Sequence, residues 1–460
     1  MELHKKSVIG IWGLATVGKS AVCYLHAQGY RLNVMDNRVL TSQEQHFLQE
    51  KNITWYAQET ESDLFFNSSD FIIPSPGINI TQSCYATNKH KFITELDFFY
   101  QNFHKPIIAI TGSVGKTSVT HILGKLFAQL SIPVAIGGNI GTPTFDLIAQ
   151  QNSVDYALLE VSSFQLMHCT TFAPRLAVWT NFYPNHLDYH ATEDEYFLAK
   201  YNIMKQQSSD SFSVISLALR EKIPAPQTHH TRAYVVLHEP IDVLSVLHDN
   251  EILYYTKNNE VWRYASGIHT PLVSLTPETL NLSFLENIII IIAICDAMKF
   301  NINALQAIAT TAQLPAHRLE HIGTINNITF YNDSKATTTA STLTAVEKLK
   351  NKPLHLFLGG CSKGVDRAPF VAQLKNSVKY IYCFGKEAEH LYTLCKNNSI
   401  PAMHFTTLDE AFAYCLQTLN ADDYVLLSPA GSSFDLYKNY EERGDHFKQL
   451  LRNYTQRNTL

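Results

Sequence analysis

The sequence has few charged residues and no long apolar run. Asp, Glu, Lys and Arg make up 17% of its 460 residues, below the roughly 25% of an average soluble protein. That scarcity disfavours a long disordered tail or a coiled coil. The longest uninterrupted apolar run, residues 288–295, is too short for a bilayer, which takes about 20 residues to cross. We therefore expect a cytoplasmic protein that does not enter a membrane.

A basic excess and paired cysteines are also missing. Lys and Arg number 36 against 41 Asp and Glu, which gives a net charge of -5. This argues against a nucleic-acid binder, because such proteins usually carry a clear basic excess. The eight cysteines stand singly, without a C-x-x-C pair, so a zinc ribbon is disfavoured and reduced thiols are expected. A local basic pocket for a phosphate group is still compatible with this composition.

Short apolar runs alternate with helical stretches along the chain, which predicts α/β domains with parallel sheets. Breaks near residues 105 and 315 predict three domains, 1–104, 105–314 and 315–460. Apolar runs flank Asn258-Asn259 and predict a hairpin, in a stretch at 210–275 that we expect to form an antiparallel edge of the middle domain. The predicted parallel strands are 8–12, 32–35, 71–73, 107–110, 156–159, 176–179, 329–331, 354–358, 380–384 and 424–427.

Two glycine-rich turns follow predicted strands and open helices. Residues 13–20 fit the strict G-x-x-x-x-G-K-[ST] pattern of a phosphate loop, whereas residues 111–118 keep only its core, Gly112-x-x-Gly115-Lys116-Thr117. That core is sufficient to bind a phosphate group. Glycines let backbone N–H groups point at phosphate oxygens, Lys116 supplies a positive charge, and the Thr117 hydroxyl can bind Mg²⁺.

The residues after each turn separate the two. After the first turn, the next strand ends in Asp36, an acidic residue suited to a ribose or base edge. After the second turn, one strand ends at Glu160, where a metal-binding carboxylate would lie, and another ends near Asn181 and His186. We therefore assign ATP and Mg²⁺ to the second turn and a different nucleotide to the first.

Further segments carry a more specific pattern. They are Glu160-Val-Ser162-Ser-Phe-Gln165, Asn181-x-x-x-Asn185-His186 and the stretches 137–141, 314–320, 332–337, 358–364, 427–435 and 440–444. Together with the loop at 111–118, and in order over the whole length, they resemble the Mur ligases of peptidoglycan synthesis. The stretches at 137–141 and beyond residue 332 are most similar to the members of this family that use D-glutamate.

The resemblance implies a fold and a reaction. The fold is α/β with three domains: a Rossmann-like N-terminal domain, a P-loop ATPase-like central domain with an antiparallel edge, and a Rossmann-like C-terminal domain. The reaction is ATP-dependent amide formation, in which a phosphorylated carboxylate is attacked by an amine. The implied substrates are UDP-N-acetylmuramoyl-L-alanine and D-glutamate, with two Mg²⁺ ions. We expect a monomer that binds neither nucleic acid nor membrane.

The resemblance also implies roles for single residues of this sequence. Lys116, His186 and Lys200 are expected to be catalytic. One Mg²⁺ is expected at Thr117 and Glu160, and a second between His186 and a carbamylated Lys200. ATP is expected to contact Gly112, Ser113, Gly115, Lys116, Thr117, Ser118, Asn287, Arg318, Asp333 and Lys335. The UDP-linked substrate is expected at Leu14, Thr16, Asp36, Arg38, Ser75, Gly77, Asn139, Ser162 and Gln165. D-glutamate is expected at Thr337, Lys363, Ser433 and Tyr440.

Three alternatives stay open at this point. A nicotinamide oxidoreductase would use the turn at 13–20 and Asp36, but it leaves residues 112–118 and Glu160 without a role. Another Mur-type or folylpolyglutamate-type ligase would share the ATP site and differ in the amino acid. A decayed, non-catalytic relative would be compatible with departures such as Val114 and Ser283-Phe284.

Overall fold

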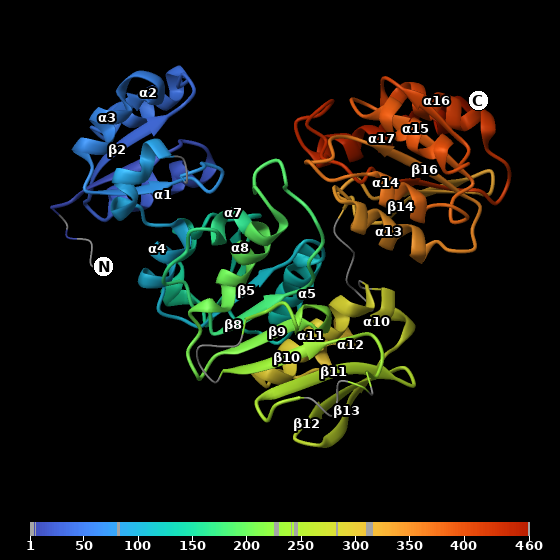
Figure 1. The fold of residues 1–460 in the computed structure, drawn as a ribbon, viewed down its shortest axis with the longest axis horizontal. Coiled ribbons are helices and arrows are strands. Elements are labelled where there is room, and N and C mark those ends of the chain that lie inside the picture. The colour runs from blue at the N-terminus through green and yellow to red at the C-terminus, as the bar shows by residue number, and fades with distance from the viewer. Residues whose placement is uncertain are drawn as a thin grey trace. The chain divides into compact units, whose positions relative to one another are not determined.

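The computed structural model describes residues 4, 6–80, 83–224, 230–240, 242, 247–281, 284–309 and 316–458. Strands and helices alternate and build three mainly parallel sheets (Figure 1), so the predicted α/β class is confirmed. Contacts divide the chain into two units, 1–181 with 197–312 and 182–196 with 313–460. The predicted boundary at 314/315 lies outside the described residues, and the three domain limits stay a prediction.

The first sheet is parallel and has the order β3-β2-β1-β4. Its strands are β1 (Val8–Trp12), β2 (Arg31–Asp36), β3 (Thr54–Ala57) and β4 (Phe71–Pro74), and the helices after them are α1 (Thr16–Ala27), α2 (Ser42–Glu50), α3 (Gln58–Ser68) and α4 (Glu95–Asn102). Because all four strands run the same way, the turns after β1, β2, β3 and β4 meet at one edge of the sheet.

The second sheet has the order β13-β12-β11-β10-β9-β8-β5-β7-β6. Its strands are β5 (Ile107–Thr111), β6 (Val134–Gly138), β7 (Tyr156–Glu160), β8 (Leu176–Trp179), β9 (Phe212–Ser216), β10 (Thr231–Val235), β11 (Glu251–Lys257), β12 (Glu260–Ala265) and β13 (Ile268–Ser274). The predicted hairpin is confirmed, since β11 and β12 pair antiparallel around Asn258 and Asn259, which both have positive φ. The prediction of an antiparallel stretch from 210 was wrong in part, because β9, β10 and β11 pair in parallel.

Helices pack on this sheet and bury its core. They are α5 (Lys116–Gln129), α6 (Thr144–Ile148), α7 (Ser163–Leu166), α8 (Glu193–Lys205), α10 (Pro277–Asn281), α11 (Leu285–Met298) and α12 (Ala304–Ala309). The isoleucine run of α11 is fully buried against α5 and strands β9–β11, which explains why this helix is apolar on every side. Among the described residues, no helix is both long and apolar enough to cross a membrane.

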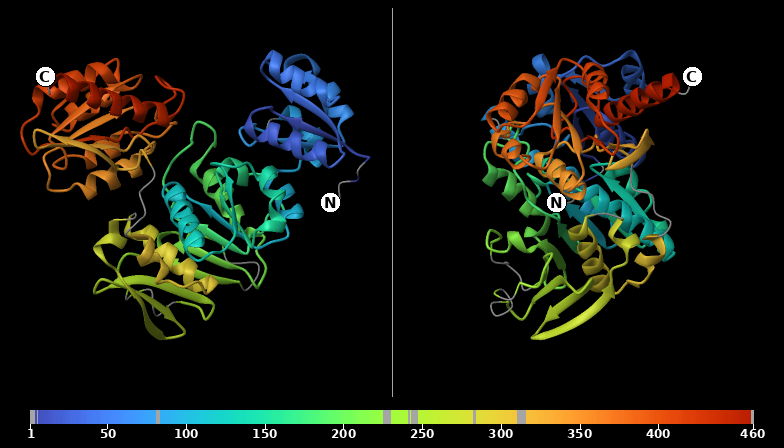
Figure 2. Two further views of the ribbon diagram at one scale, coloured as in Figure 1. Left: turned by 180° about the vertical axis from the view of Figure 1, so that it is seen from behind. Right: turned by 90° about the vertical axis from the view of Figure 1, so that its right-hand side faces the viewer.

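The third sheet has the order β14-β15-β19-β16-β17-β18, with only β14 antiparallel. Its strands are β14 (Glu320–Ile325), β15 (Ile328–Asn332), β16 (Leu354–Gly359), β17 (Tyr380–Phe384), β18 (Ala402–Phe405) and β19 (Tyr424–Leu427). Its helices are α13 (Thr339–Lys348), α14 (Ala368–Gln373), α15 (Ala388–Asn397), α16 (Leu408–Thr418) and α17 (Tyr440–Asn458). Figure 2 shows these elements (orange to red) from two further directions.

Candidate active site

The second glycine-rich turn connects β5 to the N-terminus of α5. Gly115 caps this helix with a φ of 90°, a left-handed conformation that favours glycine. A Cβ at Gly112 would lie 1.9 Å from Oγ1 of Thr180, so only glycine fits there. Lys116 is the first residue of α5, and its Nζ donates to the carbonyl oxygen of Gly112 at 2.8 Å. The ammonium therefore lies over the turn at a helix N-terminus, where an anion is stabilised.

The end of β8 holds this turn in place. Oδ1 of Asn181 accepts from the N–H of Val114 at 2.9 Å, and Nδ2 of Asn181 donates to the Val114 carbonyl at 3.1 Å. The Thr180 hydroxyl donates to the same carbonyl at 2.6 Å, and the N–H of Ser113 donates to the Asn181 carbonyl at 3.2 Å. Asn181 thus fixes the turn through backbone groups, which makes the side chain at position 114 dispensable for its shape.

The end of β7 brings a carboxylate to the other side of β5. Glu160 is 2% exposed, and its Oε1 accepts from Nδ2 of Asn139 at 3.3 Å. Its Oε2 is buried and has no hydrogen-bond partner among the described residues. A buried carboxylate oxygen without a partner is costly, and a cation would satisfy it. Glu160, with Thr117 on the first turn of α5, therefore fits a Mg²⁺ ion.

The described residues contain no cluster of three or more His, Cys, Asp or Glu that could hold a metal ion. A cage built from the protein alone is therefore not formed by these residues. Mg²⁺ commonly binds through one or two protein oxygens, with phosphate oxygens and water as its other ligands. The pair Thr117 and Glu160 suits that mode of binding.

Lys200 reaches the same turn from α8. It is 2% exposed, and its Nζ donates to the carbonyl of Gly112 at 3.0 Å and to Oγ1 of Thr111 at 3.4 Å. Burial, followed by the nearby charge of Lys116, lowers the pKa of Lys200 well below its ordinary value, although Glu160 opposes this shift. The amine is therefore biased toward its neutral form beside the predicted phosphate site.

The other predicted ATP residues of this unit lie close to the turn. Ser113 and Ser118 are both buried in or directly after it. Asn287, at the start of α11, is buried, and its Oδ1 would be 2.6 Å from a Cβ at Gly115, so it lies against the loop. Ser283, which belongs to the sequence segment that suggested Asn287, lies outside the described residues.

The first glycine-rich turn has a different geometry despite its stricter sequence match. Nζ of Lys19 is ion-paired with Oε1 of Glu44 at 2.8 Å, and its side chain is 46% exposed. The hydroxyl of Ser20 donates to Oδ1 of Asp146 at 2.7 Å. Both groups are thus bound to residues outside their own turn, whereas Lys116 donates to a carbonyl of its turn. This arrangement supports the prediction that the ATP phosphates belong to the second turn.

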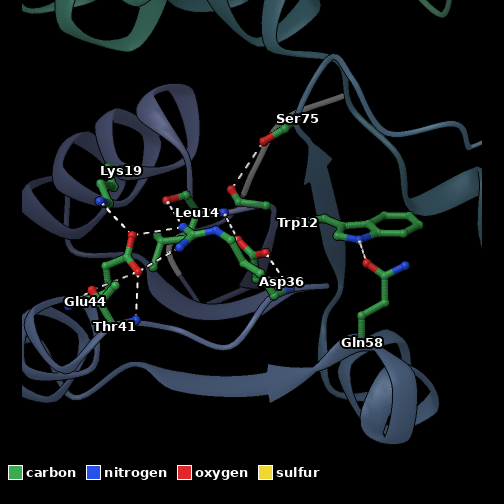
Figure 3. Close-up of polar contacts among 10 residues, drawn as sticks. Trp12, Leu14, Lys19, Asp36, Thr41, Glu44, Gln58 and Ser75 are labelled. Carbon is green, nitrogen blue, oxygen red and sulfur yellow. Dashed lines mark hydrogen bonds and ion pairs between the residues drawn. The ribbon is translucent and has the colours of Figure 1, made fainter. Parts of the chain in front are cut away.

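A cavity of about 390 Å³ opens beside this first turn, and Figure 3 shows polar contacts of several residues around it. Four predicted UDP-substrate residues line it, namely Asp36, Arg38, Ser75 and Gly77. Leu14 and Thr16 are not among its lining residues; Leu14 is buried, and its N–H donates to Oδ2 of Asp36. Sequence reasoning missed eight lining residues, which come from five separate stretches of the chain: Trp12, Gly13, Ala15, Asn37, Gln58, Ile78, Asn79 and Tyr85.

A second, small cavity of about 20 Å³ continues from Ser75 toward the middle of the same unit, where Gln165 and Glu95 line it. Ser162 caps α7 and shares a capping box with Gln165, whose Nε2 donates to Oε2 of Glu95 at 3.3 Å. Burial raises the pKa of Glu95. Ser75 lines both cavities, and Asn139 contacts Glu160.

In the second unit, Asp333 follows β15. Its Oδ2 accepts from the Ser428 hydroxyl at 2.8 Å and its Oδ1 from the N–H of Leu319 at 3.1 Å. Burial raises the pKa of Asp333 to about 7, against these hydrogen bonds and the charge of Arg318. Arg318 and Asp333, which come from two separate predicted segments, are therefore close enough to interact.

The predicted D-glutamate residues of this unit fall into two pairs, Thr337 with Tyr440 and Lys363 with Ser433. Near β15, Nζ of Lys335 lies 4.9 Å from the ring centroid of Tyr440, and the N–H of Thr337 donates to the Lys335 carbonyl. Beyond β16 and β19, the loops of Lys363 and Ser433 are joined, because Cys361 and Ser432 exchange backbone hydrogen bonds of 2.9 and 3.0 Å.

Sequence reasoning missed the pair that fixes the Lys363 loop. Oε1 of Glu387 accepts from the N–H of Ser362 at 2.7 Å, and Oε2 lies 3.3 Å from Nη2 of Arg367, a side chain that is only 1% exposed. Glu387 follows β17 and lies more than twenty residues from the loop, so no local signal indicates this contact. The ion pair holds the backbone beside Lys363 in position.

His186 belongs to the second unit, whereas Lys200 belongs to the first. His186 has a φ of 58°, and its N–H donates to Oδ1 of Asn185 at 3.0 Å. Within its unit, the next residue borders the Lys363 loop, since a Cβ at Gly364 would be 3.0 Å from the Leu187 carbonyl carbon. The expected pairing of His186 with Lys200 stays a prediction.

Three family profiles match this chain in order. Residues 6–94 match the MurD-like N-terminal domain of Mur ligases, residues 110–238 the Mur ligase middle domain, and residues 317–431 the glutamate ligase domain of Mur ligases. A curated relative, the UDP-N-acetylmuramoylalanine--D-glutamate ligase of Geotalea uraniireducens, is 30% identical over 463 residues and covers 98% of each chain.

The chain belongs to the Mur ligase family.

Other relatives agree with this membership. The ligase of the same name from Fervidobacterium nodosum is 29% identical over 96% of this chain and 97% of its own length. Solved structures share the fold. The UDP-N-acetylmuramate-alanine ligase of Thermotoga maritima superposes with a TM-score of 0.56 at 14% identity, covering 98% of this chain and 99% of its own. The MurF ligase of Thermotoga maritima, solved with ADP, gives 0.56 at 15% identity, covering 98% and 96%.

The two lysines of the two glycine-rich turns provide a matched test. We expect Lys116→Ala in this Mur ligase to weaken ATP binding by about 10- to 100-fold, because a hydrogen bond to a charged group contributes about 1.5–3 kcal/mol. Lys19→Ala should leave ATP affinity unchanged. Isothermal titration of the full chain with ATP and Mg²⁺ measures both, with thermal unfolding as the control for folding. Weaker ATP binding in Lys19→Ala than in Lys116→Ala would contradict the assignment.

Proposed function

We propose that this chain joins D-glutamate to UDP-N-acetylmuramoyl-L-alanine at the expense of ATP, as a step in making a peptidoglycan precursor. The observation that carries the proposal is the phosphate loop with Lys116 above it and the buried, unpartnered Oε2 of Glu160 beside it. Full-length similarity to relatives named UDP-N-acetylmuramoylalanine--D-glutamate ligase supports the choice of substrates.

The reaction solves a leaving-group problem. A carboxylate oxygen of the alanine attacks the γ-phosphorus, an O–P bond forms, and ADP leaves. The amine of D-glutamate then attacks the acyl carbon, the C–N bond forms, inorganic phosphate leaves, and a base takes the extra proton. Both steps need positioning and charge neutralisation more than covalent chemistry by the protein.

The residues of the phosphate loop would supply most of that neutralisation. Lys116 and the N–H groups at the start of α5 would contact the β- and γ-phosphates, while Asn287 would contact the adenine side. Thr117 and Glu160 would hold a Mg²⁺ ion, which neutralises charge on the transferring phosphoryl group when bound. In the second unit, Asp333 would contact the ribose, with Arg318 and Lys335 near the phosphates.

Lys200 would hold a second Mg²⁺ together with His186, after carbamylation of its amine. Carbamylation needs a neutral amine, and the lowered pKa of Lys200 supports that form. The product is a carboxylate on a long arm, the kind of oxygen ligand that Mg²⁺ prefers. The hydrogen bonds of the Lys200 amine to Gly112 and Thr111 support this role, because both partners belong to the turn proposed to bind phosphate.

Binding of both organic substrates uses the loops already described. The UDP end would occupy the 390 Å³ cavity, and Asn139, Ser162 and Gln165 would line the path of the muramoyl part. Lys363 with the hydroxyl groups of Thr337 and Ser433 would hold the two carboxylates of D-glutamate, next to the Tyr440 ring. We propose domain limits at 1–104, 105–314 and 315–460. Action as a monomer in the cytoplasm stays a prediction.

The choice of amino acid is the most direct test of this function. With UDP-N-acetylmuramoyl-L-alanine, ATP and Mg²⁺, we expect phosphate release with D-glutamate and none above background with L-glutamate, L-lysine or meso-diaminopimelate. Release with another amino acid would assign a sister activity in the family. No release with any of them, despite ATP binding, would favour a decayed relative.

The modified lysine has its own test. We expect Lys200→Ala to lower kcat by about 100-fold or more, in the range of losing one charge-stabilising group in an active site. Added formate or acetate should restore part of the rate, because either carboxylate can replace the missing oxygen ligand. Lys205→Ala, on the exposed side of the same helix, is the matched control and should keep full activity. Loss of activity without any carboxylate rescue would contradict the carbamate.

A further inference from the structure

Three polar side chains of the 390 Å³ cavity, Asp36, Arg38 and Ser75, are hydrogen-bonded within the protein. Both oxygens of Asp36 accept backbone N–H groups, Oδ2 from Leu14 at 2.7 Å and Oδ1 from Arg38 at 3.0 Å. The Arg38 guanidinium donates to Glu44 and to the Leu14 carbonyl, and the Ser75 hydroxyl donates to the Gly13 carbonyl. These groups shape the cavity wall (Figure 3) and have little capacity left to distinguish one base from another.

Gln58 differs from them because one end of its amide is fixed and the other is not. It is the first residue of α3, directly after β3, and it lines the cavity. Its Oε1 accepts a hydrogen bond of 2.9 Å from Nε1 of Trp12. An indole N–H can only donate, so the amide oxygen must face Trp12. The amide nitrogen is then the remaining end, and it makes no hydrogen bond among the described residues.

The indole itself is held rigidly. Trp12 ends β1 and is fully buried, and its ring contacts the edges of Phe66 and Tyr85 at centroid distances of 5.5 and 4.8 Å. A rotation of the Gln58 amide would place its NH₂ group against the indole N–H, two donors without an acceptor. The packing of Trp12 therefore fixes Gln58 as a hydrogen-bond donor in the cavity wall.

We propose that Gln58, oriented by Trp12, selects the base of the nucleotide by donating to the 4-carbonyl oxygen of uracil. This rests on the proposed function, which places a uridine nucleotide in this cavity. Uracil carries an acceptor at position 4, whereas cytosine carries an amino donor there. Cytosine would bring two donors together and leave both unsatisfied, which is a strong means of rejecting a close analogue. Gln58 thus determines specificity, and Trp12 positions it.

The test compares UDP with CDP by isothermal titration of the full chain, so that the effect of each variant is a ratio of two affinities. We expect the wild-type chain to prefer UDP by about tenfold or more, the effect of one hydrogen bond gained or lost. In Gln58→Glu, one carboxylate oxygen still accepts from Trp12, and the other can only accept. This variant should lose the preference for UDP or reverse it, since its free oxygen suits the cytosine amino group.

Two further variants separate recognition from general damage. Gln58→Met keeps the side-chain length without the amide. It should weaken UDP binding and remove the donor–donor clash with CDP, so that the ratio of the two affinities approaches one. Trp12→Phe keeps Gln58 but removes the indole N–H that orients its amide. The ratio of UDP to CDP affinity should therefore also move toward one. Glu59→Gln, at the exposed neighbouring position, changes the charge nearby without altering the amide and should keep the wild-type ratio.

An unchanged ratio of UDP to CDP affinity in both Gln58→Glu and Gln58→Met would overturn the proposal, as would equal affinities in the wild-type chain. These outcomes are distinct from failure of the ligase function. Phosphate release with D-glutamate together with an unchanged ratio would refute only the role of Gln58. A ratio that changes as expected in a chain without ligase activity would support the base recognition and refute the ligase.

Discussion

The position of β5 between β7 and β8 is the constraint on which the candidate site depends. Parallel pairing on both sides brings three strand ends to one edge of the sheet. The middle strand leads into the phosphate loop, β8 supplies Thr180 and Asn181 to clamp it, and β7 delivers Glu160. Val114 and Asn181 thereby meet although they are 67 residues apart in the sequence. The arrangement of these three strand ends results from strand order rather than from any single local motif.

Burial gives this edge of the sheet its chemistry. Glu160 and Lys200 are almost completely removed from solvent, and isolated charges in such a place are unfavourable. The protein leaves one carboxylate oxygen of Glu160 without a partner among the described residues and biases the Lys200 amine toward neutrality. Both features raise the free energy of the site, and the proposed cation and phosphates would lower it. Such a site would be preorganised for charges that arrive with the substrate.

Much of the fold could be predicted from the sequence, because strands buried on both faces form continuous apolar runs. The runs at Val8–Trp12, Leu176–Trp179 and Tyr424–Leu427 coincide with β1, β8 and β19. Half-exposed edge strands such as β18 (Ala402–Phe405) lack that signal and were missed. The assignment of the phosphates to residues 111–118 rests on Glu160 and Asn181 at the ends of later strands and stays a prediction, although residues 13–20 match the strict pattern better.

Contacts that depend on tertiary packing could not be predicted. The hydrogen bond between Trp12 and Gln58 joins positions 46 residues apart. The contact of Glu387 with the Lys363 loop also has no local sequence signal. The loop residues of the proposed D-glutamate site were named only through family resemblance. Their grouping depends on the Cys361 and Ser432 bridge, which neither residue type suggests.

The central claim is that the edge after β5, β7 and β8 binds ATP and its metal ion. The most direct measurement is a crystal structure of the full chain with a non-hydrolysable ATP analogue and Mn²⁺ in place of Mg²⁺, with the metal located by anomalous scattering. We expect a metal peak within coordination distance of Glu160 and Thr117, and the phosphates over residues 112–118. Triphosphate bound at residues 13–20, or a metal remote from Glu160, would contradict the account.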